Sequence, residues 1–175
     1  MKWLKGAGFD YDELEIGRAA LAPLPIAATE VAVVAKPVRD NGEPLAAVDE
    51  RLPVFRPYLT LGFRHCPSSL YLREGVISRL VGVATALPTD FDLVLLDGWR
   101  SRVFQQELLE YYREASEGSI EGYVADPKNP SVIPGHVTGG AVDLTLSYRG
   151  QPLALGSDYD EFSERAHLGA LESET

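Results

Sequence analysis

The stretch SVIPGHVTGGAVDLTL, residues 131–146, decides how this part of the chain folds, because a loop, a glycine pair and a strand follow one another directly. Apolar residues alternate after the glycines, which is typical of a strand with one buried face. The run GGAVDLTLSY (139–148) therefore predicts a strand. Asp143 interrupts its apolar pattern, either as a strand-end carboxylate of no consequence or as a ligand that shares a cation with His136.

The chemistry of these two side chains allows a metal site. Imidazole nitrogen and carboxylate oxygen are both ordinary zinc ligands. Gly139 and Gly140 let the backbone between them follow a compact path that other residues resist. The spacing of His136 and Asp143 alone leaves both interpretations of Asp143 open.

Further strands are predicted upstream of this stretch. FDLVLLD (91–97) is a short apolar run typical of a buried strand, and TEVAVVAKPV (29–38) is β-branched and apolar. Asn41-Gly42 predicts a tight turn. The prolines of the segment 48–63 favour an extended loop or edge strand over a helix.

Two helices are predicted. Apolar residues recur at helical spacing from Leu72 to Leu87, which predicts a helix capped by Ser68 or Ser69 and ended by Pro88. The segment 98–118 predicts a second helix that ends before Gly118. Its apolar side comprises Phe104, Leu108, Tyr111 and Tyr112. The segments 123–135 and 154–175 are expected to be loops.

Composition and element order together predict one α+β domain over residues 1–175. The length of 175 residues and the 45% hydrophobic content suit one domain with its own core. Helices and strands alternate irregularly, which favours a small, mostly antiparallel sheet with flanking helices. The single cysteine, Cys66, excludes an internal disulfide and agrees with a reducing compartment.

Charge and hydropathy exclude several functions. The net charge of −10 disfavours nucleic-acid and anionic-membrane partners. The amino terminus lacks the apolar core of a signal peptide, and no apolar run is long enough to cross a bilayer. We therefore expect a cytoplasmic protein, while the oligomeric state stays open.

Three blocks, LLDGWRS (95–101), PGHVTGGAVDLTL (134–146) and LGSDYDEFSERAH (155–167), occur in an order that resembles the D-alanyl-D-alanine dipeptidases. These are zinc metallopeptidases related to D-Ala-D-Ala carboxypeptidases and lysostaphin-like enzymes, and the resemblance extends from about Val31 onward. It implies the fold of that family, a Zn²⁺ cofactor and hydrolysis of D-alanyl-D-alanine or a similar small dipeptide. The implied roles are cell-wall precursor metabolism or glycopeptide resistance.

The resemblance also implies roles for individual residues. The zinc-binding histidine and aspartate of the family match His136 and Asp143. The arginine that polarises the scissile carbonyl matches Arg100, and the carboxylate that holds the substrate's amino group matches Asp160. Arginine suits its role because it keeps its charge and presents a rigid fork of donors.

The chain departs from the family pattern in three places. Ser101 replaces a proline after the arginine, and Pro134 replaces a serine before the histidine. The family's Glu-Trp-Trp-His block, which supplies the general base and the third zinc ligand, is absent, because the only tryptophans are Trp3 and Trp99. We therefore expect the domain to be incomplete at its C-terminal end.

This absence leaves alternatives open. One alternative is that the chain is a truncated, non-catalytic relative that acts as a binding module. The other is that it is the N-terminal fragment of a nicked enzyme, and that the C-terminal piece supplies the missing groups. His167 is a weak substitute for the third ligand, since the family carries a histidine there in addition to its ligand. His65 and Cys66 are expected to be structural, and Tyr58 is a candidate pocket residue.

Overall fold

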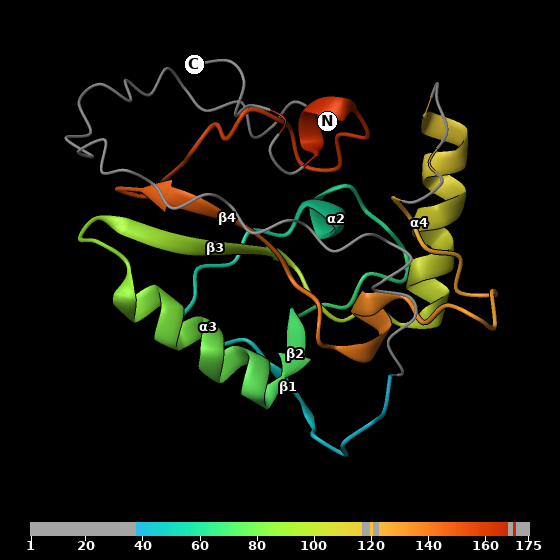
Figure 1. The fold of residues 1–175 in the computed structure, drawn as a ribbon, viewed down its shortest axis with the longest axis horizontal. Helices are drawn as coiled ribbons and strands as arrows, with labels where there is room; N and C mark the ends of the chain where they lie inside the picture. The colour runs from blue at the N-terminus through green and yellow to red at the C-terminus, as the bar shows by residue number, and fades with distance from the viewer. Residues whose placement is uncertain (1–37, 117–119, 121–122, 168–169, 171–175) are drawn as a thin grey trace.

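The computed structural model describes residues 38–116, 120, 123–167 and 170, which form an α+β structure around a small antiparallel sheet (Figure 1). β4 (Asp143–Tyr148) lies between β3 (Phe91–Asp97) and β5 (Gln151–Pro152), and a separate pair joins β1 (Leu45–Ala47) to β2 (Tyr71–Arg73). The helices are α2 (Pro57–Thr60), α3 (Glu74–Ala86) and α4 (Arg102–Ala115), with 3-10 turns η2 (Gly135–Thr138) and η3 (Glu164–Ala166). The predicted fold class is confirmed.

The register of β3 against β4 determines where polar groups meet at the end of the sheet. The strands pair regularly from Phe91 with Tyr148 to Leu95 with Leu144, and the register then shifts so that Asp97 lies opposite Asp143. Such irregularities in a ladder redirect side chains and are common beside functional sites. Here the shift places two carboxylates from distant parts of the chain at one sheet end.

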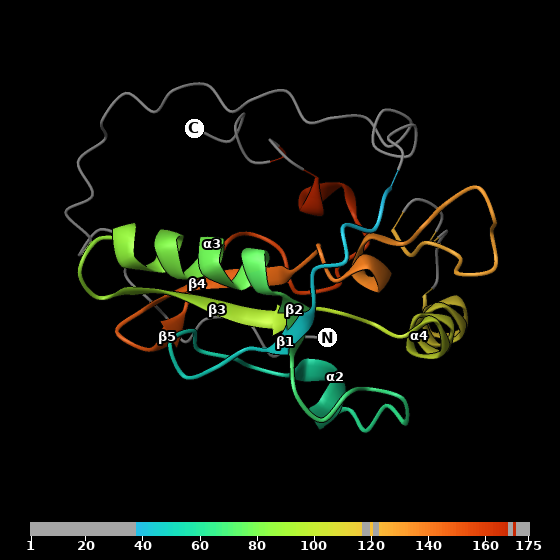
Figure 2. The same ribbon diagram turned by 90° about the horizontal axis from the view of Figure 1, so that it is seen from below.

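α3 covers one face of this sheet (Figure 2). The cluster between them is aliphatic and consists of Leu52, Leu70, Leu72, Ile77, Leu80, Leu93 and Leu95. Leu72 and Leu95 are completely buried. Full burial of such a side chain stabilises the folded state by about 1.5–3 kcal/mol, so this cluster is a main source of stability.

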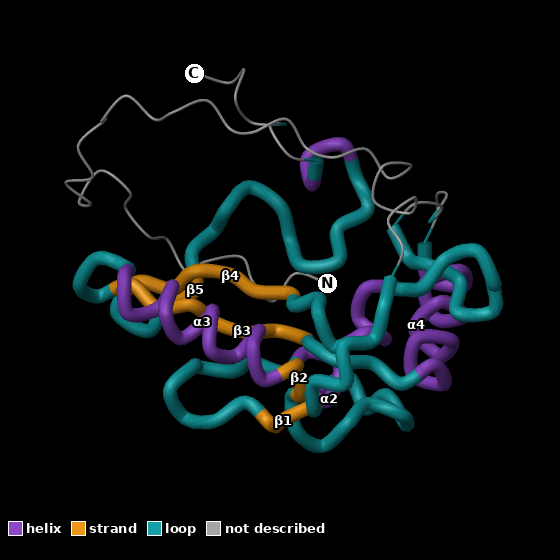
Figure 3. The backbone as a smooth tube through the Cα atoms, turned by 60° about the horizontal axis from the view of Figure 1, so that its bottom comes forward, coloured by secondary structure: helices purple, strands orange, loops and turns teal. Residues whose placement is uncertain are grey.

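α4 stands at the opposite end of the molecule from α3 and packs on a different cluster (Figure 3). This second cluster combines aromatic and aliphatic side chains and consists of Tyr58, Phe104, Leu108, Leu109, Tyr112 and Ile120. Tyr58 meets Phe63 and Phe104 edge to face, with ring centroids 5.5 Å and 5.7 Å away. The two clusters therefore differ in chemistry as well as position.

The predicted helices are confirmed, with corrected boundaries. The first begins at Glu74 rather than near Ser69, because residues 71–73 pair with β1 as a strand, and neither serine caps it. Its end at Leu87 before Pro88 is as expected. The second begins at Arg102, where Ser101 accepts a hydrogen bond from the Phe104 N–H and caps the helix.

Other expectations need correction. The segment 48–63 contains the short helix α2, because a proline suits the first helical position. Tyr111 is 40% exposed and lies off the buried side of α4. Gly42 has φ of +73° and its N–H donates to Asp40, as a turn requires.

Two expected features lie outside the residues that the structure describes. One is the expected strand at residues 29–37, and the other is the helix end at Gly118. Within the described ranges, no helix is both long and apolar enough to cross a membrane.

Candidate metal and substrate site

The turn η2 carries His136 and is fixed to β2. The Arg73 N–H donates to the Gly139 carbonyl (3.0 Å), and Arg73 Nε donates to the Thr138 carbonyl (2.8 Å). Gly139 has φ of +74°, and a Cβ there would lie 2.4 Å from Leu45 Cδ2. Only glycine fits this position without a shift, so the glycine noted in the sequence seats η2 against the β1–β2 pair.

The ring of His136 is held in one orientation. Its Nδ1 lies 2.7 Å from the Gly98 carbonyl oxygen, and the Arg100 N–H donates back to the His136 carbonyl at 3.2 Å. A carbonyl oxygen only accepts, so Nδ1 carries the proton and Nε2 is left as the reactive nitrogen. Carbonyl partners of this kind orient metal-binding histidines.

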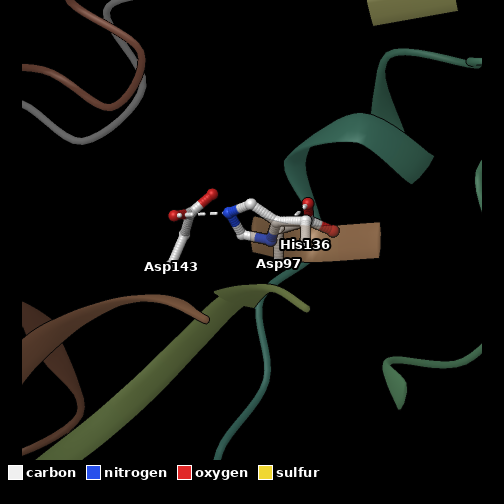
Figure 4. Close-up of side chains that lie close together, drawn as sticks. All are labelled: Asp97, His136 and Asp143. Atoms are coloured by element: carbon white, nitrogen blue, oxygen red, sulfur yellow. Dashed lines mark ion pairs between the residues drawn. The ribbon is translucent and has the colours of Figure 1, made fainter. Parts of the chain in front are cut away.

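Nε2 of His136 faces Oδ1 of Asp143 at 3.3 Å (Figure 4). Zinc bonds of about 2.0–2.2 Å in a tetrahedral arrangement separate two such ligand atoms by about 3.3–3.5 Å. Two acceptors that face each other need a cation or a proton between them. The pair therefore fits a shared zinc ion without rearrangement.

The two oxygens of Asp143 have separate partners. Oδ1 faces His136, whereas Oδ2 accepts hydrogen bonds from Arg100 Nη2 (3.1 Å) and from the Tyr159 hydroxyl (3.0 Å). Burial raises the pKa of Asp143, but His136 and Arg100 outweigh it, and the pKa lies below its usual value. The carboxylate is thus ionised at neutral pH, as a metal ligand must be.

Arg100 is buried, and its guanidinium is fixed by several acceptors. Nε donates to Asp97 Oδ2 at 2.5 Å, and Nη1 donates to Gln105 Oε1 at 3.2 Å. Burial lowers the pKa of Arg100, but Tyr58, Asp97 and Asp143 raise it overall. Arg100 is therefore a permanent, immobile cation beside the His136–Asp143 pair.

Asp97 belongs to this cluster and was missed by the sequence reasoning. One ligand atom from each of Asp97, His136 and Asp143 lies within 4.8 Å of the others. Asp97 nevertheless lies on the Nδ1 side of His136 (3.9 Å), and the proton on this nitrogen points to a carbonyl. The Oδ2 atom of Asp97 accepts a hydrogen bond from Arg100. Burial raises the pKa of Asp97, and Arg100 opposes this rise. The contacts make it a positioning residue for Arg100 rather than a third ligand.

Beside this cluster lies a cavity of about 210 Å³. Polar groups converge on it from separate segments, and its remaining wall is mostly apolar or aromatic. Its lining includes Tyr58, Arg100, Gln105, Leu108, Tyr112, Tyr123, Pro134, His136, Asp143, Asp160 and Phe162. The four residues predicted from the sequence, Arg100, His136, Asp143 and Asp160, thus border one small space.

Asp160 lines the cavity from the segment that follows β5. Its Oδ2 accepts hydrogen bonds from the hydroxyls of Tyr58 (2.8 Å) and Tyr112 (2.5 Å). Burial raises the pKa of Asp160, and the hydrogen bonds from Tyr112 and Tyr58 oppose the rise. Tyr58 therefore is a cavity residue, as expected, and Tyr112 joins it from α4.

The remaining histidines lie elsewhere. His167 Nε2 is 2.8 Å from the Tyr123 hydroxyl, and the two rings stack. Among the described residues, the metal-type cluster does not include His167. His65 pairs with Glu107 at 3.0 Å, which also accepts hydrogen bonds from the backbone of residues 64 and 65, so its contacts are structural.

Comparisons with known proteins identify the family of this chain. Residues 74–173 match the model of a peptidase family described as D-ala-D-ala dipeptidase. The chain is also 29% identical over 161 residues to a D-alanyl-D-alanine dipeptidase of Synechocystis sp. (strain ATCC 27184 / PCC 6803 / Kazusa). That alignment covers 76% of this chain and 65% of the relative, so the chain spans just under two thirds of the relative's length.

Proposed function

The chain belongs to the D-ala-D-ala dipeptidase family, and we propose that it forms the metal- and substrate-binding part of a zinc-dependent dipeptidase. The substrate is D-alanyl-D-alanine or a similar dipeptide, as in cell-wall precursor metabolism or glycopeptide resistance. The observation that carries this proposal is the 3.3 Å separation of His136 Nε2 and Asp143 Oδ1, both of which line a cavity of about 210 Å³.

In this proposal His136 and Asp143 hold the zinc ion. When bound, zinc lowers the pKa of a water molecule to about 7 and polarises a carbonyl. Gly98 maintains the ring of His136 in the tautomer that presents Nε2. Arg100 and Tyr159 donate to Oδ2 of Asp143, so Oδ1 is the oxygen that would hold the ion.

Arg100 and Asp160 act on the dipeptide. The guanidinium of Arg100 is fixed before substrate enters, which is the property of an effective donor to a carbonyl oxygen that gains negative charge. The carboxylate of Asp160 accepts hydrogen bonds from the substrate's ammonium group. A cavity of about 210 Å³ favours a dipeptide over a longer peptide.

A hydrolytic zinc site requires three protein ligands and a general base near the water. Within the described residues, only Asp97 joins His136 and Asp143 in a metal-type cluster, and its contacts are to Arg100. The sequence contains no Glu-Trp-Trp-His block. We propose that the third ligand and the base come from another segment, supplied with this chain in the working enzyme.

A second candidate is a non-catalytic binding module. The observation in its favour is that the groups for recognition, Arg100 and Asp160, are held by several hydrogen bonds. Among the described residues, the metal-type cluster adds only one more carboxylate to the ligand pair, and that carboxylate is bound to Arg100. Such a protein binds the dipeptide and does not cleave it.

One assay separates the two functions. Material of verified intact mass is loaded with zinc and tested for D-alanine release, alone and with an added segment that carries the Glu-Trp-Trp-His block. We expect no release by residues 1–175 alone and recovery with the added segment. Binding without recovery supports the binding module. Robust release by the chain alone shows that a base lies within it, with Glu164 and His167 the first to test.

A further inference from the structure

Two tyrosine hydroxyls hold the carboxylate of Asp160 by a single oxygen. Tyr58 reaches it from α2 and Tyr112 from α4, and both donate to Oδ2. A carboxylate has acceptor sites on both oxygens. No described residue donates a hydrogen bond to Oδ1, on the side chain that lines the cavity.

The identity of these donors matters for the charge of Asp160. Phenol hydroxyls orient a carboxylate without neutralising it, whereas an arginine or lysine would form an ion pair. Among the described residues, no cationic side chain is within ion-pair distance of Asp160, and the neighbouring Arg100 is already paired with Asp97 and Asp143. The carboxylate is therefore oriented by neutral donors, and among the described residues no cation of the protein is paired with it.

The backbone does not fix this orientation alone. Asp160 has φ of +55° and lies in a turn in which the Glu161 N–H donates to the Asp158 carbonyl at 3.2 Å. Its neighbour Tyr159 donates to Asp143 instead, so adjacent residues of one loop contribute to two different carboxylates that line the cavity. The turn sets the backbone, and the hydroxyls of Tyr58 and Tyr112 position the carboxylate at the end of the side chain.

We infer that Tyr112 and Tyr58 are positioning residues that direct Asp160 Oδ1 into the cavity and thereby make the site selective for a free ammonium group. This inference rests on the proposed function. A ligand with an acylated amino group offers no charge to Oδ1, so it gains nothing from the oriented carboxylate. Selectivity for the free amine is then set by the two tyrosines as much as by Asp160 itself.

Tyr112 gives the cleaner test, because Tyr58 also contacts Arg100 (3.4 Å). The substitution Tyr112→Phe removes the hydroxyl and keeps the ring against Tyr111 and Phe162. Tyr111→Phe is the matched control: it lies next along the same helix, is 40% exposed and has no contact with Asp160. Thermal unfolding of both variants checks that the fold is kept.

The measurement is calorimetric binding of D-alanyl-D-alanine and of N-acetyl-D-alanyl-D-alanine to the zinc-loaded chain. We expect the unsubstituted protein to prefer the free amine, and Tyr112→Phe to weaken binding of the free dipeptide by roughly ten-fold, since hydrogen bonds to charged groups contribute at this level. Binding of the acetylated dipeptide should not change. Tyr111→Phe should match the unsubstituted protein for both ligands.

An unchanged preference in Tyr112→Phe, or equal weakening for both ligands, overturns the inference and leaves the proposed function intact. Failure of the unsubstituted protein to bind the free dipeptide overturns the proposed function and the inference together. Should Tyr112→Phe unfold, Tyr58→Phe gives the same comparison, since its ring remains packed on Phe63 and Phe104. Tyr58→Phe must then reduce the preference for D-alanyl-D-alanine over the acetylated dipeptide.

Discussion

The two hydrophobic clusters of this molecule are built from different chemistry. The cluster under α3 is aliphatic, and its members are buried leucine and isoleucine side chains with no polar atoms. The cluster under α4 is partly aromatic, and the hydroxyls of Tyr58 and Tyr112 extend from it to the half-buried carboxylate of Asp160. The difference indicates that one end of the sheet supplies stability, while the other supplies a rigid apolar support for charged groups.

The largest effect is expected at the metal ligands. His136→Ala should abolish stoichiometric zinc binding while the protein still folds, because the ring contributes one of two ligands and is not part of either buried cluster. Atomic absorption on the purified variant measures the zinc content, and circular dichroism checks the fold. His65→Ala is the control and should keep its zinc, since His65 contacts Glu107. Zinc retained in His136→Ala would remove the ligand assignment.

A smaller effect is expected at the guanidinium. Arg100→Lys in the assembled enzyme should lower turnover by about 100- to 1000-fold with a minor change in substrate binding, because lysine keeps the charge and loses the fork that fits Asp97, Gln105 and Asp143. Steady-state kinetics separates kcat from KM. Arg102→Lys, whose arginine donates to the Pro127 carbonyl, should keep normal turnover. Equal turnover in both variants contradicts a catalytic role for Arg100.

Substitutions in the aliphatic cluster should lower the stability of the protein and leave zinc binding unchanged. Leu95→Ala should reduce the free energy of unfolding by about 2–5 kcal/mol, because the leucine is completely buried and leaves a cavity. Zinc per folded molecule should not change. Val83→Ala on the same helix–sheet layer, where the valine is 50% exposed, should change stability by less than about 0.5 kcal/mol. Urea denaturation and zinc analysis together test this separation of stability from function.

The smallest effect on stability is expected at Asp160, where folding raises the carboxyl pKa through burial. For a raised pKa, the favourable contribution to stability is complete below the unfolded-state pKa of about 3.9 and is lost as pH rises through the folded-state pKa. Asp160→Asn should therefore be close to neutral for stability at pH 7, and wild type should gain relative to it as pH falls. Dipeptide binding should nevertheless be weaker. A large loss of stability at pH 7 contradicts this account.

Much of the aliphatic half could be predicted from the sequence, because periodicity reports burial directly. The strand 91–97 and the helix end before Pro88 follow from apolar runs and their breakers. The strand 71–73 could not be predicted in this way, since three residues carry no periodicity and their strand conformation depends on pairing with β1. Tertiary pairing overrode the helical spacing that begins at Leu72.

Some residues of the candidate site could likewise be predicted from the sequence, and others could not. Resemblance of short motifs located Arg100, His136, Asp143 and Asp160, and the structure places all four around one cavity. Asp97 and Tyr112 could not be found, because their contacts depend on the β3–β4 register and on the side of α4 that meets the loop after β5. The signal that the sequence offered for Asp97 was its place at the end of the predicted strand 91–97, three residues before Arg100.

The position of a bound zinc ion tests directly whether His136 and Asp143 are its ligands. Crystals of the zinc-loaded protein, measured at the zinc absorption edge, give an anomalous peak that locates the ion. If His136 and Asp143 hold the ion, one peak lies about 2.0–2.2 Å from both His136 Nε2 and Asp143 Oδ1, with Asp97 still bound to Arg100. A peak on Asp97 or on Nδ1 of His136, or the absence of any peak between His136 and Asp143, would contradict this assignment.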